Sequence, residues 1–362
     1  MLRPSLFAVL IIALSTFAFS QAPVQQPTLT PQNSGTIQLL IAVSPVNSNV
    51  VWASGTGGTY VVTTDGGKTW KSGVVPGAEA LQFRDVQGVS DKVAYLLSIG
   101  DNTTDFRIYK TVDGGANWSL EFQNETVSAF YDCFAFWAPN KGVAHSDSVN
   151  GLFPEIRTLS GQKWHSIEGS MPPALPGEAS FSSSGTCITT QGESNAWITT
   201  GGATTSRIIA TTDGGNTWNA YDTPLVSNPS AGGLSVAFRD AWHGIVGGGD
   251  LATNYTIQAA TSDDGGHTWT KTKKLPIGGT IFALAYAAGM TLSGSTDPSD
   301  RRVVVTSEDA PNFDKGAAAW TPDEGQTWYR ISGASGYWAV AFANPQAGWF
   351  VGNNGQILKI SF

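Results

Sequence analysis

Short apolar segments separated by turn residues recur along most of the chain. One set comprises residues 81–83, 94–97 and 108–110, and comparable sets follow at 236–246 and from 281 onward. Short alternating or apolar runs bounded by turn residues predict β-strands, and no long stretch carries apolar residues at the helical period. The pattern therefore predicts an all-β chain assembled from one repeated group of strands.

Each group of strands leads into the same short motif, which first reads TTDGGKTW at residues 63–70. Further copies read TVDGGANW, TTDGGNTW, SDDGGHTW and TPDEGQTW, and TLSGQKW at residues 158–164 is a copy that has lost its aspartate. The closing tryptophans stand at positions 70, 118, 164, 218, 269 and 328, a spacing of 46 to 59 residues. A repeat of this size that contains several strands is typical of one blade of a β-propeller.

The motif has the chemistry of a tight turn. Its carboxylate can accept N–H bonds from the residues that follow, its glycine can take a positive φ, and its tryptophan can pack between blades. A geometry repeated around a ring is what a fold requires and not what a single active or metal site requires. We therefore assign a structural role to Asp65, Trp70, Asp113, Trp118, Asp213, Trp218, Asp264, Trp269, Asp323 and Trp328.

The number of repeats predicts the number of blades. Six motif positions are followed by three more strands, at residues 338–342, 348–351 and 356–360, which form a seventh unit without its outer strand. Residues 28–38 could supply that strand and leave the ring without an open edge. We predict a seven-bladed β-propeller of four-stranded antiparallel blades over residues 36–362, preceded at 21–35 by an extended lead-in that helps to close the ring.

The first residues have the features of a signal peptide. Arg3 precedes an apolar run at residues 6–18, and small residues at Ala18 and Ser20 fall where a signal peptidase reads the chain. The run is shorter than the roughly 20 residues that span a membrane. We expect a signal peptide over residues 1–20, cleavage near Ser20–Gln21, no membrane insertion, and a secreted or periplasmic protein.

The charge of the chain excludes one class of partner, and its two cysteines predict a cross-link. Charged residues make up 13% of the chain and the net charge is −8, which argues against nucleic acid, because phosphates attract basic patches. Export makes a disulfide chemically possible. Cys133 and Cys187 fall at matching positions on adjacent innermost strands, so we expect a bond or a near contact between them.

Together these motifs resemble those of Asp-box (BNR) repeat propellers over nearly the whole chain after the leader. The sequence is similar to photosystem II stability/assembly-factor-like repeat proteins, and more distantly to sortilin and sialidase propellers. HSDSVNG (145–151) and PALPGEASFSSSGTC (173–187) also resemble an exported bacterial family often labelled "oxidoreductase". That label has no residue behind it in this chain, which contains no GxGxxG after a strand and no CxxCH. We expect no cofactor and no metal site.

A sialidase would need several converging arginines to hold the substrate carboxylate. The nearest match is the tripeptide FRD, which occurs at residues 83–85 and 238–240. We place both copies where the innermost strand turns into the second, at the same end of the blade as the aspartate motifs. There the aspartate would cap backbone groups, away from the face on which propellers bind ligands.

The opposite face carries the polar residues that the repeat does not explain. Candidate ligand-binding residues there are Arg107, Asp132, His145, Asp147, Glu178, Arg207 and Asp250. They could bind a sugar or a peptide, carry out acid–base hydrolysis, or only satisfy loop backbone groups. We expect an exported, monomeric, non-catalytic propeller that binds a protein, peptide or glycan on this face and assists assembly or stability. The alternative is a glycoside hydrolase that uses the carboxylates of the central funnel.

Overall fold

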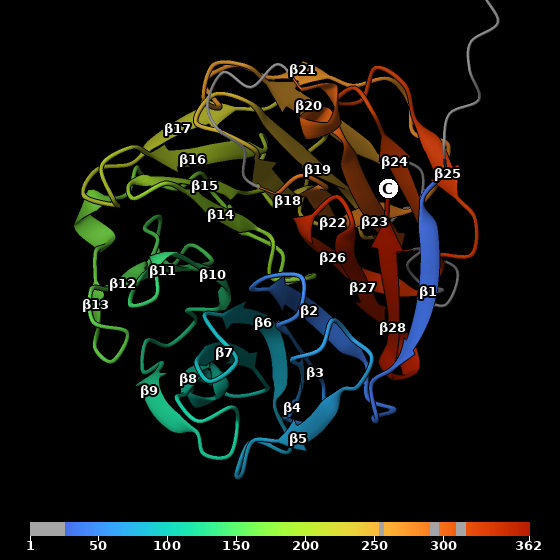
Figure 1. The fold of residues 1–362 in the computed structure, drawn as a ribbon. Coiled ribbons are helices and arrows are strands. Elements are labelled where there is room, and N and C mark those ends of the chain that lie inside the picture. Colours follow the sequence, from blue (N-terminus) through green and yellow to red (C-terminus); the bar gives the residue numbers. More distant parts are fainter. Residues whose placement is uncertain (1–25, 253–256, 290–296, 309–315) are drawn as a thin grey trace, which may run out of the picture.

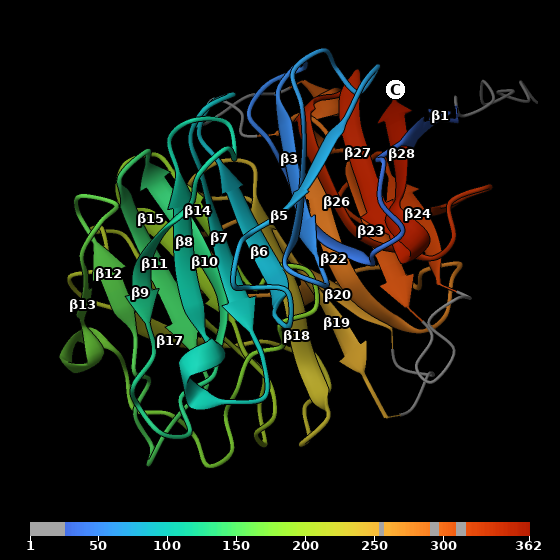
Figure 2. The same cartoon turned by 90° about the horizontal axis from the view of Figure 1, so that it is seen from below.

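The computed structural model describes residues 26–252, 257–289, 297–308 and 316–362. Seven four-stranded antiparallel sheets surround a central axis as the blades of a propeller (Figures 1 and 2). The predicted all-β, seven-bladed architecture is confirmed. The predicted leader, residues 1–20, lies outside the described residues. Within the described ranges, no helix has the length and apolar character needed to cross a membrane.

The strands of each blade run in sequence order from the central axis outward, except that β1 is the outermost strand of the seventh blade. The first three blades are β2 (Leu40–Pro45), β3 (Val51–Gly55), β4 (Thr59–Thr63), β5 (Lys71–Val74); β6 (Gln82–Gly88), β7 (Ala94–Ile99), β8 (Arg107–Thr111), β9 (Ser119–Gln123); and β10 (Tyr131–Ala138), β11 (Lys141–Ser146), β12 (Ile156–Thr158), β13 (Trp164–Ser166). The next three are β14 (Ile188–Gln191), β15 (Asn195–Thr199), β16 (Arg207–Thr211), β17 (Asn219–Asp222); β18 (Ala231–Phe238), β19 (Gly244–Asp250), β20 (Gln258–Ser262), β21 (Thr270–Lys271); and β22 (Thr280–Tyr286), β23 (Val303–Glu308), β24 (Ala317–Thr321), β25 (Tyr329–Ile331). The seventh is β26 (Tyr337–Asn344), β27 (Ala347–Gly352), β28 (Gln356–Ser361) and β1 (Thr28–Asn33).

The ring is closed by the two ends of the chain. Strand β1 pairs antiparallel with β28, from Thr28 opposite Ser361 to Asn33 opposite Gln356 (Figure 1). The N-terminal segment therefore supplies the outer strand of the seventh blade, as the sequence predicts. Gln32 of β1 also accepts hydrogen bonds from the indole N–H groups of Trp70 and Trp349, which ties the first blade to the last.

The five aspartate motifs form nearly identical turns, which we call the aspartate turns. In the first, Asp65 Oδ1 accepts the Thr69 N–H at 2.9 Å, and Thr63 Oγ1 accepts the Gly67 N–H at 2.9 Å. Gly66 and Gly67 have φ values of +74° and +84°, the left-handed conformation that the motif predicts. Hydrogen bonds from the Thr69 hydroxyl and N–H lower the pKa of Asp65 to about 2. These carboxylates are therefore used by the turn itself.

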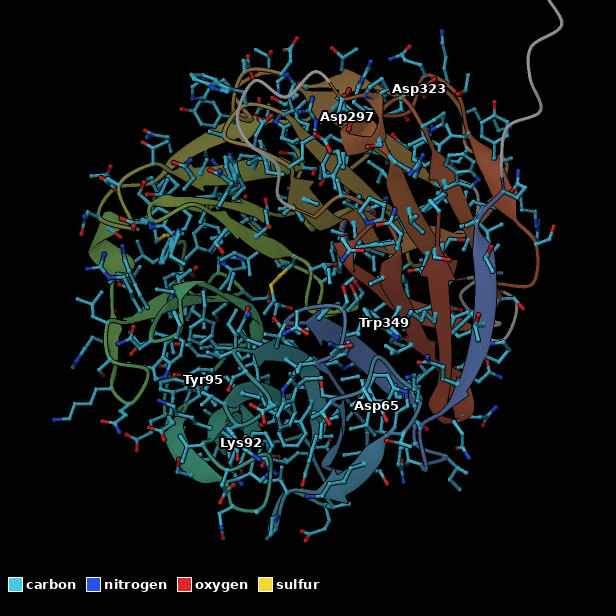
Figure 3. All side chains as sticks on the ribbon, viewed as in Figure 1. Asp65, Lys92, Tyr95, Asp297, Asp323 and Trp349 are labelled. Carbon is cyan, nitrogen blue, oxygen red and sulfur yellow. A yellow bond between two sulfur atoms is a disulfide. The ribbon has the colours of Figure 1, made fainter. Side chains whose placement is uncertain are left out.

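Aromatic side chains fill the wedges between neighbouring blades. Trp118 of the second blade contacts Tyr60 of the first edge-on, with ring centroids 5.1 Å apart. Tyr95 stacks on Phe136 of the third blade at 4.5 Å, and Figure 3 shows Tyr95 and Trp349 within the ring of blades. The tryptophans that close the motifs thus join blades, the role that the repeat predicts.

A disulfide and an irregular segment mark the centre of the ring. Cys133 of β10 is bonded to Cys187, just before β14, with Cα atoms 6.2 Å apart, and Figure 3 shows the bond near the central axis. The preceding residues 180–186, which we call the central segment, reach across to other blades. Ser183 and Ser184 donate hydrogen bonds to the Phe282 carbonyl of the sixth blade at 3.0 and 2.6 Å. The central segment therefore partly fills the channel of the propeller.

Candidate functional site

The innermost strands of six blades share a β-bulge near their first residues. The extra residues are Ile41, Arg84, Asp132, Leu234, Phe282 and Trp338. A bulge places two residues opposite one and redirects a side chain out of the regular alternation. Four of these side chains are apolar and belong to one buried cluster. The second and third blades instead present a guanidinium and a carboxyl group side by side in the ring.

Four of the bulge residues, Arg84, Asp132, Phe282 and Trp338, line a pocket of about 510 Å³, which we call the funnel pocket. Its lining residues are Arg84, Phe130, Asp132, Asp147, Ala179, Ser180, Phe181, Ser182, Ser183, Pro229, Leu251, Phe282 and Trp338. They come from the beginnings of innermost strands, the ends of second strands and the central segment. The aspartate turns join third to fourth strands, at the other end of each blade. The funnel pocket therefore opens on the face opposite these turns.

Two carboxyl groups meet in the funnel pocket. Asp132 occupies the bulge of β10 and Asp147 follows the end of β11, and the two side chains lie close enough for each to shift the pKa of the other. Asp147 Oδ1 also accepts the Ser180 N–H at 2.8 Å. Asp132 is 1% exposed, and within the described part of the chain no N–H or hydroxyl group donates to its Oδ2. Burial raises the pKa of Asp132 well above its usual range, and the Asp147 carboxylate raises it further.

Burial also raises the pKa of Asp147, although the Ser180 N–H opposes this shift. A carboxylate that is buried without donors is costly, and two adjacent carboxylates repel each other, so one proton is held between them. The arrangement differs from that of a glycoside hydrolase, whose two carboxyl groups are roughly 5 to 9.5 Å apart, with the sugar between them. Asp132 and Asp147 instead interact with each other, and each shifts the pKa of the other.

Arg84 supplies the positive charge of the funnel pocket. Its guanidinium donates to the Ser182 carbonyl at 3.1 Å and to Gln82 Oε1 at 2.9 Å, and it lies 5.6 Å from the centre of the Trp338 ring. Its Nε is buried and has no hydrogen-bond partner among the described residues. Burial lowers the pKa of Arg84, and the charge of Asp132 opposes this effect. Arg84 and Asp132 thus interact electrostatically, but they do not form an ion pair.

A buried ion pair lies behind the carboxyl pair. His145 Nδ1 is 3.0 Å from Glu155 Oε2, and both side chains are fully buried. Burial alone would lower the pKa of His145, but the Glu155 carboxylate reverses this effect and raises it. His145 and Glu155 are therefore held against each other in the core. Glu155 was not among the predicted site residues, because no motif marks it.

The other predicted residues lie outside the funnel pocket. Arg207 Nε donates to Glu178 Oε1 at 2.9 Å, and the same oxygen accepts the Thr200 hydroxyl at 2.7 Å. Asp250 accepts the Ser230 hydroxyl and the Ala252 N–H, and Arg107 donates to the Thr104 carbonyl at 2.7 Å. These side chains satisfy loop groups or one another, the structural role that the sequence left open.

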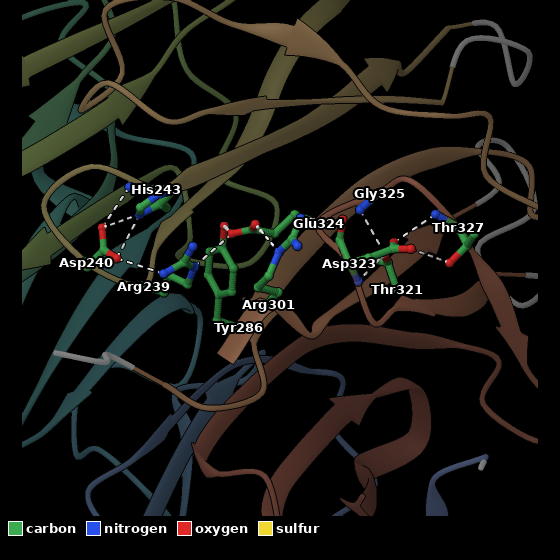
Figure 4. Close-up of polar contacts among 10 residues, drawn as sticks. All are labelled: Arg239, Asp240, His243, Tyr286, Arg301, Thr321, Asp323, Glu324, Gly325 and Thr327. Carbon is green, nitrogen blue, oxygen red and sulfur yellow. Dashed lines mark hydrogen bonds and ion pairs between the residues drawn. The ribbon is translucent and has the colours of Figure 1, made fainter. Parts of the chain in front are cut away.

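The placement of the first FRD copy was wrong. Residues 83–85 lie at the start of β6, because this strand extends to Gly88, so Arg84 belongs to the funnel face. Asp85 caps backbone as expected, but its partners are the N–H groups of Val86 and, in the next blade, Phe134. The second copy lies where predicted, after the end of β18. Asp240 Oδ1 accepts the N–H groups of Trp242 and His243 at 2.8 Å each, and Figure 4 shows Asp240 beside His243.

The second FRD copy belongs to an ion network at the opposite face, which we call the Glu324 network. Glu324 accepts hydrogen bonds from Arg239 Nε at 2.8 Å, Arg301 Nε at 2.9 Å and the Tyr286 hydroxyl at 3.0 Å (Figure 4). Arg239 also donates to Asp240 at 2.8 Å. Glu324 replaces a glycine of the repeated motif and keeps a positive φ of 55°. The network joins the fifth and sixth blades.

Arg84 and the aromatic residues of the funnel pocket were not predicted from the sequence, although a signal was present. The six innermost strands align on their shared apolar pattern, and the column that forms the bulge reads Ile, Arg, Asp, Leu, Phe and Trp. Arg84 and Asp132 are the two charged members of that column. Among the described residues, no cluster of His, Cys, Asp and Glu side chains could hold a metal ion.

The fold is that of a seven-bladed propeller with a pocket on the face opposite its aspartate turns. Two solved structures share the fold over nearly the whole chain. YCF48 bound to D1 peptide superposes with a TM-score of 0.61 and 16% identity, covering 94% of this chain and 98% of that one. YCF48 from Cyanidioschyzon merolae gives a TM-score of 0.62 and 18% identity, with 92% and 98% covered. At these identities the likeness concerns the fold. No protein-family model and no curated protein matches the chain.

Proposed function

We propose that the chain is an exported, non-catalytic propeller that binds a polypeptide segment of a partner protein in the funnel pocket, as an assembly or stability factor does. The observation that carries the proposal is the pocket itself. Its volume of about 510 Å³ falls within the range of specific ligand sites, and it combines aromatic walls with a few inward polar groups. Such a site can hold one or two side chains of an extended segment.

The pocket chemistry favours peptide over glycan. Phe130, Phe181 and Trp338 offer apolar surface, and the polar groups of Arg84 and the carboxyl pair are set among them. The structure of YCF48 bound to D1 peptide supports the proposal, because it is a propeller of the same fold that holds a peptide. The proximity of Asp147 to Asp132, which raises the pKa of Asp132, argues against hydrolysis of glycosides, because a glycosidase holds its two carboxyl groups apart with the sugar between them.

Export is part of the proposal. Disulfides persist in oxidising compartments and are rare in the cytosol, so the bond between Cys133 and Cys187 supports a location outside the cytoplasm. The leader-like residues 1–20 support the same location. Fractionation of expressing cells, with mass spectrometry of the mature N-terminus, tests this part directly. Retention in the cytoplasm with an intact N-terminus would contradict it.

Binding can be tested with a random-peptide phage library panned on the purified mature chain. The double variant Phe130→Ala/Phe181→Ala removes two walls of the funnel pocket, and it should weaken binding of the selected peptides by about tenfold or more. The matched control is Trp242→Ala, which removes a 53% exposed aromatic side chain from the opposite face and should change nothing. Equal binding by all three proteins would reject the funnel pocket as the site. Turnover of chromogenic glycosides that is lost in Asp147→Asn would reject the non-catalytic assignment.

A further inference from the structure

We propose that the funnel pocket selects a lysine or arginine side chain of the bound peptide, whose charge replaces the proton shared by Asp132 and Asp147. The inference rests on the proposed function and specifies its ligand chemistry. It begins from an unsatisfied group. Asp132 lines the pocket and is 1% exposed, and it receives no hydrogen bond from an N–H or hydroxyl group at Oδ2 within the described residues.

The charges around Asp132 and Asp147 would be balanced by one more cation. His145 is paired with Glu155, and Arg207 is paired with Glu178. These two ion pairs cancel. Among the residues that line the funnel pocket, the ionisable groups are Asp132, Asp147 and Arg84, two acids and one base. One positive charge is missing, and in the empty pocket the shared proton provides it.

Arg84 does not fill this role itself. Its guanidinium donates to the Ser182 carbonyl and to Gln82 Oε1, which hold it over the Trp338 ring and beyond ion-pair distance of Asp132. A ligand ammonium or guanidinium group can approach the carboxyl pair at Asp147, which lines the pocket and is only partly buried. On binding it donates to the two carboxylates, and the displaced proton passes to solvent.

The walls of the pocket suit the rest of such a side chain. Phe130, Phe181, Pro229 and Leu251 line the approach to the carboxyl pair. Lysine and arginine bury their aliphatic stems along apolar surface while the charged end reaches a polar partner. Aromatic faces add cation–π attraction. An acidic ligand group would find one base, Arg84, and would be repelled by the two carboxyl groups beside it.

The test uses the peptides that the phage library selects. The expected result is enrichment of lysine or arginine at one position next to apolar residues. Replacing that residue with norleucine should weaken binding to the wild-type chain by about tenfold or more. The variant Asp132→Asn keeps the shape of the side chain, and it should bind the lysine and norleucine peptides with nearly equal affinity. The control Asp263→Asn removes an exposed charge at the opposite face and should keep the full preference.

Proton release gives a second readout that does not depend on variants. Calorimetry at neutral pH in two buffers of different ionisation enthalpy should show close to one proton released per lysine peptide bound, and none for the norleucine peptide. Selected peptides without a basic preference, a preference for acidic residues, or an unchanged lysine preference in Asp132→Asn would each overturn this inference while peptide binding stands. Failure of the wild-type chain to select any peptide would instead reject the proposed function, and this inference with it.

Discussion

Two copies of the tripeptide FRD lie at opposite ends of their innermost strands and have different electrostatic surroundings. At residues 238–240 the arginine and aspartate are bonded to each other, and the arginine continues to Glu324. At residues 83–85 the two side chains diverge. Asp85 accepts backbone N–H groups, and Arg84 points into the funnel pocket, where it faces Asp132 without an ion pair.

The carboxyl groups of the two regions also differ in the direction of their pKa shifts. Burial acts to raise the pKa of Asp240, but the N–H groups of Trp242 and His243 outweigh it and lower that pKa. Burial raises the pKa of Asp132, and no such donors compensate within the described chain. Both regions border pockets of about 510 Å³. Pocket volume and the presence of charged groups therefore do not distinguish a structural ion network from a candidate binding site. Buried polar atoms that lack a hydrogen-bond partner do distinguish them.

The largest expected effect comes from the covalent link on the funnel side, which the Glu324 network lacks. Cys133 and Cys187 are 54 residues apart, so the double variant Cys133→Ser/Cys187→Ser should lower the free energy of unfolding by about 4 kcal/mol. Urea unfolding of the variant and of the wild type, with and without reductant, measures this. An unchanged midpoint would show that the third and fourth blades are held together without the bond.

A smaller loss is expected from the Glu324 network. Glu324→Ala deprives Arg239, whose side chain is 5% exposed, of a carboxylate partner, and should cost about 3 kcal/mol. Glu324→Gly removes the same carboxylate but suits the positive φ of 55°, so it should be milder by about 1 kcal/mol. Thermal and urea unfolding measure both variants. Peptide affinity should not change, and a parallel loss of binding would show that the two regions are coupled.

Asp132→Asn should raise the free energy of unfolding, whereas the preceding variants lower it. The raised pKa of Asp132 means that the folded chain retains a proton that the unfolded chain releases, so this carboxyl destabilises the fold increasingly as pH rises above the unfolded value near 3.9. The variant should match the wild type near pH 4 and exceed its stability by about 1 kcal/mol at pH 7. The charged groups facing Asp132 are Asp147, Arg84, His145 and Glu155.

Urea unfolding of both proteins across this pH range measures the difference. Asp263→Asn, on the opposite face, serves as the control for the loss of one negative charge. A stability difference between Asp132→Asn and wild type that does not grow with pH would contradict the unsatisfied state of Asp132.

The smallest effect is expected at an aspartate turn, where the carboxylate is fully bonded. Burial opposes ionisation of Asp213, but the N–H and hydroxyl of Thr217 lower its pKa to about 2. Asp213→Ala should therefore cost about 1 kcal/mol at neutral pH, comparable to the loss of a helix cap. The depressed pKa gives a stabilisation that is lost as pH falls toward 2, the reverse of Asp132. Carboxyl carbon NMR titration measures both pKa values, and equal values would contradict the contrast.

The fold could be predicted because its signal is repeated. Each aspartate turn has the same sequence pattern and the same local geometry. The repeat length can therefore be recognised even though the copy at residues 158–164 has lost its aspartate. That copy keeps half of the turn, since Thr158 Oγ1 still accepts the Gly161 N–H at 2.8 Å. Strand direction then indicated the face on which Asp132 and Asp147 meet.

The site could be predicted only in part because its geometry is set by register. A bulge shifts one residue per strand, and no single strand shows whether Arg84 stands at the start of β6 or in the following turn. Glu178 and Arg207 were grouped with the carboxyl pair because all lie on one face, but they bind each other instead. The central segment was missed because a stretch that crosses the channel carries no strand or turn pattern.

The pairing of β1 with β28 sets the order in which the ring can be completed. Its partners are separated by nearly the whole described chain, from Thr28 to Ser361. While the polypeptide is being synthesised, six blades can form, but β1 cannot pair until β28 has been made. Contacts between such remote residues are slow to form, because the loop that they close is long. The ring can therefore close only after all of its strands have been made. Until then β1 has no partner within its own chain, and β28 of another copy can pair with it.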